Sequence, residues 1–328
     1  MKISVRTSAR LHLGFYNFFS DGVAYGGLGV AIENPSVVVK VFKVEENGVK
    51  IVNRSSVDIS DCVESVVKAL GLRGIGIEVL SAIPRHVGLG STTQTVLAIA
   101  YAASKLLRLS YSVRELAVKL CRGRDSGIGI AVFELGGFVV DSGRRVGENR
   151  RILCPTSVDS LPQLIFRASM PRGWSFTVII PAMRRGFDEV SERKAMDMPQ
   201  EVSKELQLEL YKLIFLHMLP AILRRDIDTF GKALTKLQFI VGEYFSRYQG
   251  DVFCCKEAEL AVKTLLNYGA KGVGQSSWGP TVYGLVEGHV AAKKLCEKVL
   301  KELRTIGVEA KCLAVKPRNR GAEVAVEV

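Results

Sequence analysis

The most informative part of this chain is the stretch Pro84-Arg85-His86-Val87-Gly88-Leu89-Gly90-Ser91-Thr92-Thr93-Gln94. Gly88 and Gly90 flank a single leucine, so the backbone there can adopt positive φ values and approach a ligand closely. Residues 76–80 before it predict a strand, and residues 95–107 after it are alanine-rich and apolar nearly all round, which predicts a buried helix. We therefore expect a loop that leads from a strand into the N-terminus of a buried helix.

The start of that helix is predicted to bind phosphate. Ser91 occupies the expected N-cap position, and Gln94, three residues later, completes a capping box. The first backbone N–H groups of a helix have no partner within the helix, and the helix dipole favours an anion there. The alternative is an ordinary strand-to-helix turn with a good cap. The residues assigned to phosphate or substrate binding are Gly88, Leu89, Gly90, Ser91, Thr92, Thr93 and Gln94.

The N-terminal strand carries two candidate catalytic residues, Arg10 and His12. They alternate with Leu11 and Leu13, so both polar side chains are expected on one face of the strand. A guanidinium and an imidazole on that face could hold a carboxylate or a phosphate. The alternative is a strand face that simply meets solvent.

A compact charged cluster, Arg122, Arg124 and Asp125, precedes a run of glycines. Arg124 is expected to grip a phosphate, and Asp125 to hold Mg²⁺ or ribose hydroxyls, so both are candidate catalytic residues. Mg²⁺ prefers oxygen ligands, which makes Ser91 and Asp125 the candidate metal ligands. A surface network of ion pairs is the alternative.

A second glycine-rich stretch, Gly274-Gln275-Ser276-Ser277-Trp278, lies late in the chain. Glycine-flanked backbone can fold tightly enough to approach a ligand, and we assign all five residues to substrate binding. Trp278 could stack on an aromatic substrate or fill the core between two domains, and the sequence leaves both open.

The order of the predicted elements indicates an α/β (α+β) protein of two domains with the active site in the cleft between them. Proline and serine interrupt every periodicity at residues 155–171, which places the boundary there and gives domains of residues 1–160 and 161–328. Residues 37–42 and 49–52 predict a β-hairpin. Helices are expected in the second half at residues 201–223, 226–244 and 256–268.

The formal net charge of +12 indicates either an anionic partner or a solvated basic surface. Nucleic acid is not expected, because Lys and Arg form neither a basic helix nor a basic strand studded with aromatics. Arg184, Arg185 and Lys194 flank an acidic stretch and could form a lid over an anionic substrate or a solvated charge run. No apolar run approaches the ~20 residues of a membrane span and no signal peptide is visible, so we expect no membrane partner and a cytoplasmic location.

Seven scattered cysteines form no CxxC pair and no zinc-ligand spacing. An odd, scattered set is typical of reduced, mostly buried thiols. The positions are 62, 121, 154, 254, 255, 296 and 312.

Three motifs in order along the chain resemble those of the GHMP kinases, the superfamily of galactokinase and of homoserine, mevalonate and phosphomevalonate kinases. Residues 8–14 resemble the first motif, residues 84–93 the second, and residues 272–280 the third. The resemblance covers nearly the whole chain and implies the two-domain GHMP fold.

Within that superfamily, four segments are similar to those of the archaeal β-ribofuranosylaminobenzene 5′-phosphate synthases. These segments are residues 10–14, 26–29, 122–130 and 274–281. The resemblance implies a phosphoribosyl transferase that condenses phosphoribosyl diphosphate with 4-aminobenzoate or 4-hydroxybenzoate. It also implies release of CO₂ and diphosphate, on the way to methanopterin-type cofactors, with Mg²⁺ as cofactor. Apolar helices in the second half leave room for a homodimer.

One residue argues against a kinase. GHMP kinases commonly carry Ser-Gly-x-Asp, with the Asp often acting as catalytic base, whereas this chain reads Ser126-Gly127-Ile128-Gly129. Glycine cannot take a proton from a hydroxyl, a task worth ~10²–10⁴ in rate. Two alternatives remain: a kinase in which Asp125 or Glu134 substitutes, and a GHMP-like binding protein without catalytic activity.

Overall fold

The first sheet is built on two long strands at the N-terminus. In this computed structural model, which describes residues 1–147, 149, 151–182 and 189–327, strands β1 (Lys2–Ser20) and β2 (Val23–Lys43) run antiparallel. The other strands are β3 (Val49–Asn53), β4 (Ile75–Ser81), β5 (Phe138–Asp141), β6 (Arg144–Arg145), β7 (Leu164–Ala168) and β12 (Glu323–Glu327). Within the described residues the order is β12-β1-β2-β4-β3, with β5 and β6 on β2, and β7 on β5.

The predicted hairpin at residues 37–52 is wrong. Strand β4 lies between β2 and β3, and β3 pairs with β4 in parallel, with Val49 opposite Ile75. Helix α1 (Ser60–Leu70) connects β3 to β4, and a crossover of this kind joins parallel strands. The sequence pattern therefore predicted the strands correctly but not their partners.

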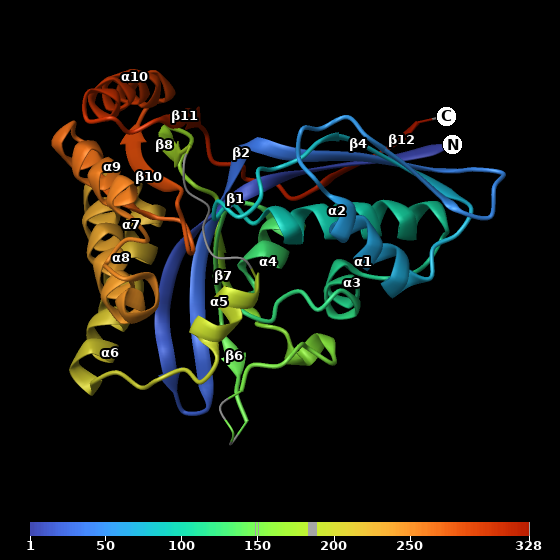
Figure 1. The fold of residues 1–328 in the computed structure, drawn as a ribbon. Coiled ribbons are helices and arrows are strands. Elements are labelled where there is room, and N and C mark those ends of the chain that lie inside the picture. Colours follow the sequence, from blue (N-terminus) through green and yellow to red (C-terminus); the bar gives the residue numbers. More distant parts are fainter. Residues whose placement is uncertain (148, 150, 183–188, 328) are drawn as a thin grey trace.

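Helices α1, α2 (Ser91–Leu106) and α3 (Val113–Lys119) lie on one face of this sheet (Figure 1). Helix α2 packs against β1 and β2 and is buried along most of its length, which confirms the predicted buried helix. Helix α4 (Ile128–Leu135) packs beside α2 and ends just before β5. The N-termini of α2 and α4 both open toward the candidate active site.

The second sheet is antiparallel and has the order β11-β8-β10-β9. Its strands are β8 (Trp174–Pro181), β9 (Gly272–Gln275), β10 (Val282–Glu287) and β11 (Ala310–Val315). Helices α8 (Ile227–Gln249), α9 (Lys256–Asn267) and α10 (His289–Thr305) pack against this sheet. Helix α6 (Lys204–Tyr211) packs against β1, and the π-helical segment η2 (Lys212–Met218) and α7 (Leu219–Arg224) pack against α8. The three helices predicted in this half are confirmed. A 3₁₀ turn η1 (Val158–Ser160) and helix α5 (Glu189–Met196) belong to the connections before them.

The two halves share packing and hydrogen bonds. One continuous cluster of buried apolar side chains runs from β1 and α2 to α8 and β8. Strand β12 returns to pair with β1, so the two termini lie side by side (Figure 1). The domain boundary placed between residues 160 and 161 stays a prediction.

The expectation of reduced cysteines is wrong for four of them. Cys121 is bonded to Cys154, and Cys296 to Cys312. The two cysteines of each pair are 33 and 16 residues apart in the sequence, respectively. No local spacing pattern therefore predicts these disulfides. Cys62, Cys254 and Cys255 are free thiols.

One continuous helical segment, Lys204–Arg224, has the length and hydropathy of a membrane span among the described residues. About 39% of the apolar 18-residue window within it is buried inside the protein. A single such helix is weak evidence for a membrane, because core helices of soluble proteins have the same composition.

Candidate active site

The predicted phosphate loop folds over the N-terminus of α2. Gly88 and Gly90 have φ values of +84° and +77°, and a side chain on Gly88 would overlap the carbonyl oxygen of Ser276. The helix's first hydrogen bond runs from Gln94 N–H to Gly90 O at 3.2 Å. The N–H groups of residues 91–93 precede it and, together with the helix dipole, favour an anion at this point.

The predicted capping box is wrong. Gly90, in the left-handed conformation, is the N-cap, and Ser91 is the first helical residue without a side-chain cap hydrogen bond. Gln94 is fully buried: it accepts a hydrogen bond from Thr7 Oγ1 at 2.5 Å and donates to Gly129 O at 2.8 Å. Gln94 therefore ties α2 to β1 and α4 instead of closing the helix end.

Two side chains from distant segments hold the loop. Arg10 Nη1 donates to Gly88 O at 2.5 Å, and the Arg10 N–H donates to Leu89 O at 3.2 Å. Ser276 Oγ donates to the same Gly88 oxygen at 2.7 Å and accepts the His12 N–H at 2.9 Å. The first strand, the phosphate loop and the late glycine-rich stretch therefore meet at one carbonyl group.

His12 is a buried, neutral imidazole. Burial and, second, the charge of Arg10 lower the pKa of His12 well below 6.5. Its Nδ1 accepts the Gly14 N–H at 3.2 Å, so Nε2 carries the proton and lies 3.2 Å from Ser126 Oγ. The ring is neutral and both its nitrogens are hydrogen-bonded within the protein. The expectation that this imidazole holds a phosphate or carboxylate stays a prediction.

Asp141 lies behind Ser126 and was not singled out from the sequence. Its Oδ1 accepts N–H groups of Gly27 and Gly143 at 3.1 and 2.8 Å; its Oδ2 accepts Gly127 N–H at 2.8 Å and Ser126 Oγ at 3.3 Å. Burial raises the pKa of Asp141 to about 6, against the opposing effect of these donors. The only signal in the sequence was a carboxylate at the end of the apolar strand β5.

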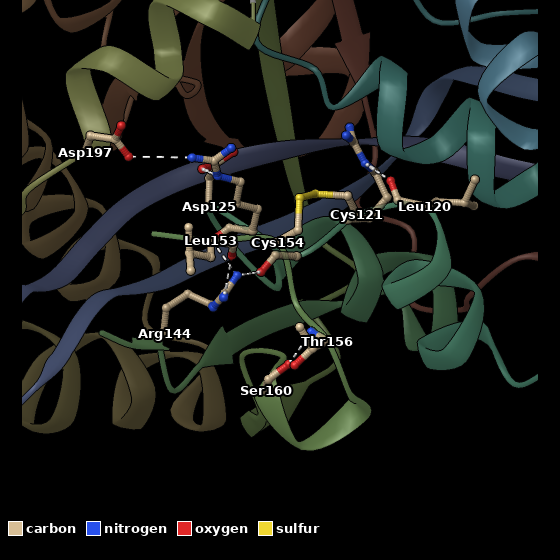
Figure 2. The surroundings of a disulfide bond; sticks show 12 residues. Leu120, Cys121, Asp125, Arg144, Leu153, Cys154, Thr156, Ser160 and Asp197 are labelled. Carbon is tan, nitrogen blue, oxygen red and sulfur yellow. Dashed lines mark hydrogen bonds and ion pairs between the residues drawn. A yellow bond between two sulfur atoms is a disulfide. The ribbon is translucent and has the colours of Figure 1, made fainter. Parts of the chain in front are cut away.

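The loop that carries Arg124 and Asp125 is fixed from below (Figure 2). Arg144, only 5% exposed, donates to the carbonyl oxygens of Gly123, Arg124 and Leu153, each at 2.8 Å. The Cys121–Cys154 disulfide joins the same two segments. Arg124 Nη2 also lies 3.5 Å from Asp197 Oδ1, just after α5. The loop that carries Arg124 and Asp125 thus forms a wall of the cleft that a disulfide and hydrogen bonds hold in place.

The late glycine-rich stretch supports the loop and closes one end of the cleft. Gly274 packs under Gln238, where a side chain would overlap the glutamine. Gln275 N–H donates to Gln238 Oε1 at 2.7 Å, and Gln238 Nε2 donates to Leu13 O at 2.9 Å. The Trp278 ring lies 4.7 Å from that of Phe245.

These segments enclose a cleft of about 1060 Å³, counting its open mouth. The predicted residues that line it are Arg10, His12, Gly88, Gly90, Ser91, Thr92, Thr93, Arg124, Asp125, Ser277 and Trp278. Leu89, Gln94, Gly274, Gln275 and Ser276 lie behind this wall as supports. Ser126 also lines the cleft. Arg122 and Arg193 line it too and, with Arg10 and Arg124, give it a cationic character. Arg184 and Arg185 lie outside the described residues, and Lys194 is exposed on α5.

Comparison with known proteins decides the family. Residues 58–137 match the model of the GHMP kinases N-terminal domain and residues 218–305 that of the GHMP kinases C-terminal domain. A protein of Archaeoglobus fulgidus named β-ribofuranosylphenol 5′-phosphate synthase is 33% identical over 99% of this chain and all of its own length. A protein of Methanothermobacter thermautotrophicus with the same name is 30% identical over 98% of both chains. The chain belongs to this synthase family of the GHMP superfamily.

Solved structures confirm the fold of this GHMP protein. Homoserine kinase from Cytophaga hutchinsonii superposes with a TM-score of 0.70 at 18% identity, over 99% of this chain and 97% of that one. Mevalonate diphosphate decarboxylase from Staphylococcus aureus superposes with a TM-score of 0.64 at 15% identity, over 99% and 98%. At this identity the likeness establishes the two-sheet GHMP architecture and nothing about chemistry.

Gly129 stands at the edge of the cleft in the first turn of α4. A side chain on Gly129 would point at Thr93 of the phosphate loop, with its Cβ 3.0 Å from Thr93 Cγ2. An aspartate there would therefore reach the anion site, whereas glycine brings no acid or base. Glu134 cannot substitute, because it lies near the other end of α4 and pairs with Arg114 at 3.3 Å.

The cleft offers oxygen donors that fit a magnesium ion. No cluster of three His, Cys, Asp or Glu side chains able to hold a metal occurs in the described part of the chain. Asp125 and the hydroxyls of Ser91, Thr92 and Thr93 line the cleft. One carboxylate with hydroxyls and substrate phosphates is a donor set that Mg²⁺ accepts, since it keeps several waters and binds through few protein ligands.

Proposed function

We propose that this protein condenses phosphoribosyl diphosphate with a para-substituted benzoate, releasing CO₂ and diphosphate, as a β-ribofuranosylphenol 5′-phosphate synthase. The observation that carries the proposal is full-length identity of 33% to a protein of that name, combined with Gly129 in place of a base at the anion site. The name of the relatives contains a phenol, which favours 4-hydroxybenzoate over 4-aminobenzoate. The reaction would take place in the cytoplasm, as a step in the biosynthesis of a methanopterin-type cofactor.

The phosphate loop and the cationic wall stabilise the departing diphosphate. The bond between ribose C1 and the diphosphate oxygen breaks, and its electron pair leaves with diphosphate. The N–H groups of residues 91–93, Arg10 and Arg124 face the cleft where that negative charge develops. Mg²⁺, held by Asp125 and Ser91, would supply further charge neutralisation of the phosphates when bound.

The aromatic acceptor forms the new bond through the ring carbon that carries its carboxylate. The para hydroxyl or amino group donates electron density into the ring, and the new C–C bond forms at ribose C1. The bond to the carboxylate then breaks, its electron pair restores the aromatic ring, and CO₂ leaves. No proton is gained or lost overall, so a kinase-type base is dispensable. A neutral His12 does not repel the positive charge that develops on the ribose.

Carboxyl-labelled 4-hydroxybenzoate tests the proposal. With phosphoribosyl diphosphate and Mg²⁺, the purified protein should release labelled CO₂ and diphosphate in equal amounts. Label retained in the product, or ATP-dependent phosphorylation of homoserine or mevalonate, would show that the reaction has been assigned to the wrong class.

We also propose a homodimer formed through the outer face of α6, η2 and α7. Four large apolar side chains there are exposed: Leu208, Phe215, Leu216 and Leu223, at 53, 45, 64 and 69%. Exposed apolar patches of this kind are typical of protein interfaces. A light-scattering mass of about 36 kDa, that of one chain, would contradict the dimer.

A further inference from the structure

A second, aromatic cavity opens beside the anion-binding cleft. Its walls include the rings of Phe15, Phe245, Phe253 and Trp278, which are only 8, 4, 4 and 7% exposed. The Phe15 and Phe245 ring centroids lie 6.0 Å apart, and those of Phe245 and Trp278 lie 4.7 Å apart. The aromatic cavity therefore presents ring faces and edges suited to a flat aromatic ligand.

The chemistry of the two cavities differs sharply. Among the described residues that line the aromatic cavity, none is Asp, Glu, Lys or Arg, and the polar side chains include three glutamines. The anion-binding cleft carries several arginines instead. His12, Phe15, Ser277 and Trp278 line both cavities and form their shared wall. Two ligands of different chemistry can thus meet at this wall.

We propose that the aromatic cavity binds the para-substituted benzoate, with its carboxylate end at the shared wall and its para substituent among the glutamines. This inference rests on the proposed function, which requires a polyanionic donor and an aromatic acceptor side by side. The reacting ring carbon carries the carboxylate, so that end of the ring must face the ribose in the anion-binding cleft. The para substituent, on the opposite side of the ring, then points away from the cleft.

An amide on the wall of the aromatic cavity can bind the para substituent. Cys254 N–H donates to Gln275 Oε1 at 2.8 Å, and Gln275 Nε2 donates to Gln249 Oε1 at 3.3 Å. Gln249 Nε2 in turn donates to Val252 O at 2.8 Å, which fixes the orientation of the amide. A carbonyl oxygen has two lone pairs, so Gln249 Oε1 can accept one more donor. Both a hydroxyl and an amino group offer that donor.

Filling the aromatic cavity tests its assignment. Val241 of α8 lines the cavity, and Val241→Phe should weaken 4-hydroxybenzoate binding by about 10-fold or more through steric overlap. Phosphoribosyl diphosphate affinity should stay within about twofold, because the anion site does not include Val241. The matched control is Val290→Phe, the same change at a residue 66% exposed on α10. Both affinities are measured by titration calorimetry, which needs no turnover.

Gln249→Leu tests the contact with the para substituent separately. It should weaken 4-hydroxybenzoate about 10-fold, as expected when a hydrogen bond to a neutral group is lost, and leave unsubstituted benzoate unchanged. A purely structural role would weaken both ligands alike.

The two proposals fail in different ways. Wild-type protein that binds 4-hydroxybenzoate in the aromatic cavity but releases neither CO₂ nor diphosphate would overturn the proposed function and leave the site standing. If the wild type turns over but the wild type and Val241→Phe bind 4-hydroxybenzoate equally well, the assignment of the aromatic cavity as the acceptor site is overturned. Equal losses for benzoate and 4-hydroxybenzoate in Gln249→Leu would overturn the assignment of the para end.

Discussion

Asp141 offers a sharp test of the electrostatics behind the cleft, through the change Asp141→Asn. The folded state holds the Asp141 proton up to about pH 6, whereas the ordinary pKa of an aspartate is 3.8. Between these pH values the folded chain binds one proton more than the unfolded chain, so the free energy of unfolding falls as pH rises. Two pKa units correspond to about 3 kcal/mol. This stabilisation is present below pH 3.8 and is lost as pH rises through 6.

The variant keeps the shape of the side chain and removes its titration. An asparagine has one acceptor oxygen, so one of the buried N–H groups of Gly27, Gly143 or Gly127 faces an amide donor, at a cost of about 1–3 kcal/mol. That cost does not depend on pH. The stability of wild type relative to Asp141→Asn should therefore decline by about 2.5 kcal/mol between pH 4 and pH 7.

Urea unfolding at half-unit pH steps measures this difference. Asp159→Asn, at an exposed residue, controls for the loss of one carboxylate from the chain. If the free energies of unfolding of wild type and Asp141→Asn change with pH in parallel, the pKa of Asp141 is not raised. The description of Asp141 as a buried carboxylate held by dipolar donors would then be wrong.

Three further predictions concern the anion site. Ser91→Ala should raise the KM for phosphoribosyl diphosphate about 10-fold by removing a donor to a charged oxygen, with an unchanged melting temperature because Ser91 makes no cap hydrogen bond; an unchanged KM would contradict this. Excess EDTA should abolish condensation and Mg²⁺ should restore it, whereas full activity in EDTA would exclude the metal. Gly129→Asp should lower kcat/KM about 100-fold through like-charge repulsion of ~3 kcal/mol at an effective dielectric constant of 20, without creating phosphoryl transfer from ATP; unimpaired condensation would show that residue 129 does not face the donor.

The sequence predicted the loop and the buried helix after it because their signals are local. Two glycines, three hydroxyl residues and an apolar helix follow one another in residues 88–106, and each restricts the backbone by itself. The same locality explains the failed capping box. Serine followed by glutamine at the right spacing is compatible with a cap, but Gly90 can adopt the left-handed conformation that a serine avoids, and it takes the N-cap position instead.

The features that the sequence did not reveal depend on segments that meet only in the folded chain. Asp141 and Ser126 are 15 residues apart, and Ser126 and His12 are 114 apart. Cys121 and Cys154 are likewise joined by tertiary structure. Neither hydropathy nor residue spacing records which strand end faces which loop, so a buried carboxylate at the end of β5 looked like any other strand terminus.

The roles of the predicted residues follow from this distinction between local and tertiary signals. Gly88 O receives hydrogen bonds from Arg10 and Ser276, so the shape of the anion site depends on residues far apart in sequence. The motif predicts where phosphate binds, and the proposed reaction depends on the contacts around it. Replacing one aspartate by Gly129 can therefore remove a kinase base while the loop, its supports and the fold persist. The reaction then depends on what lies across the shared wall, where the aromatic cavity begins.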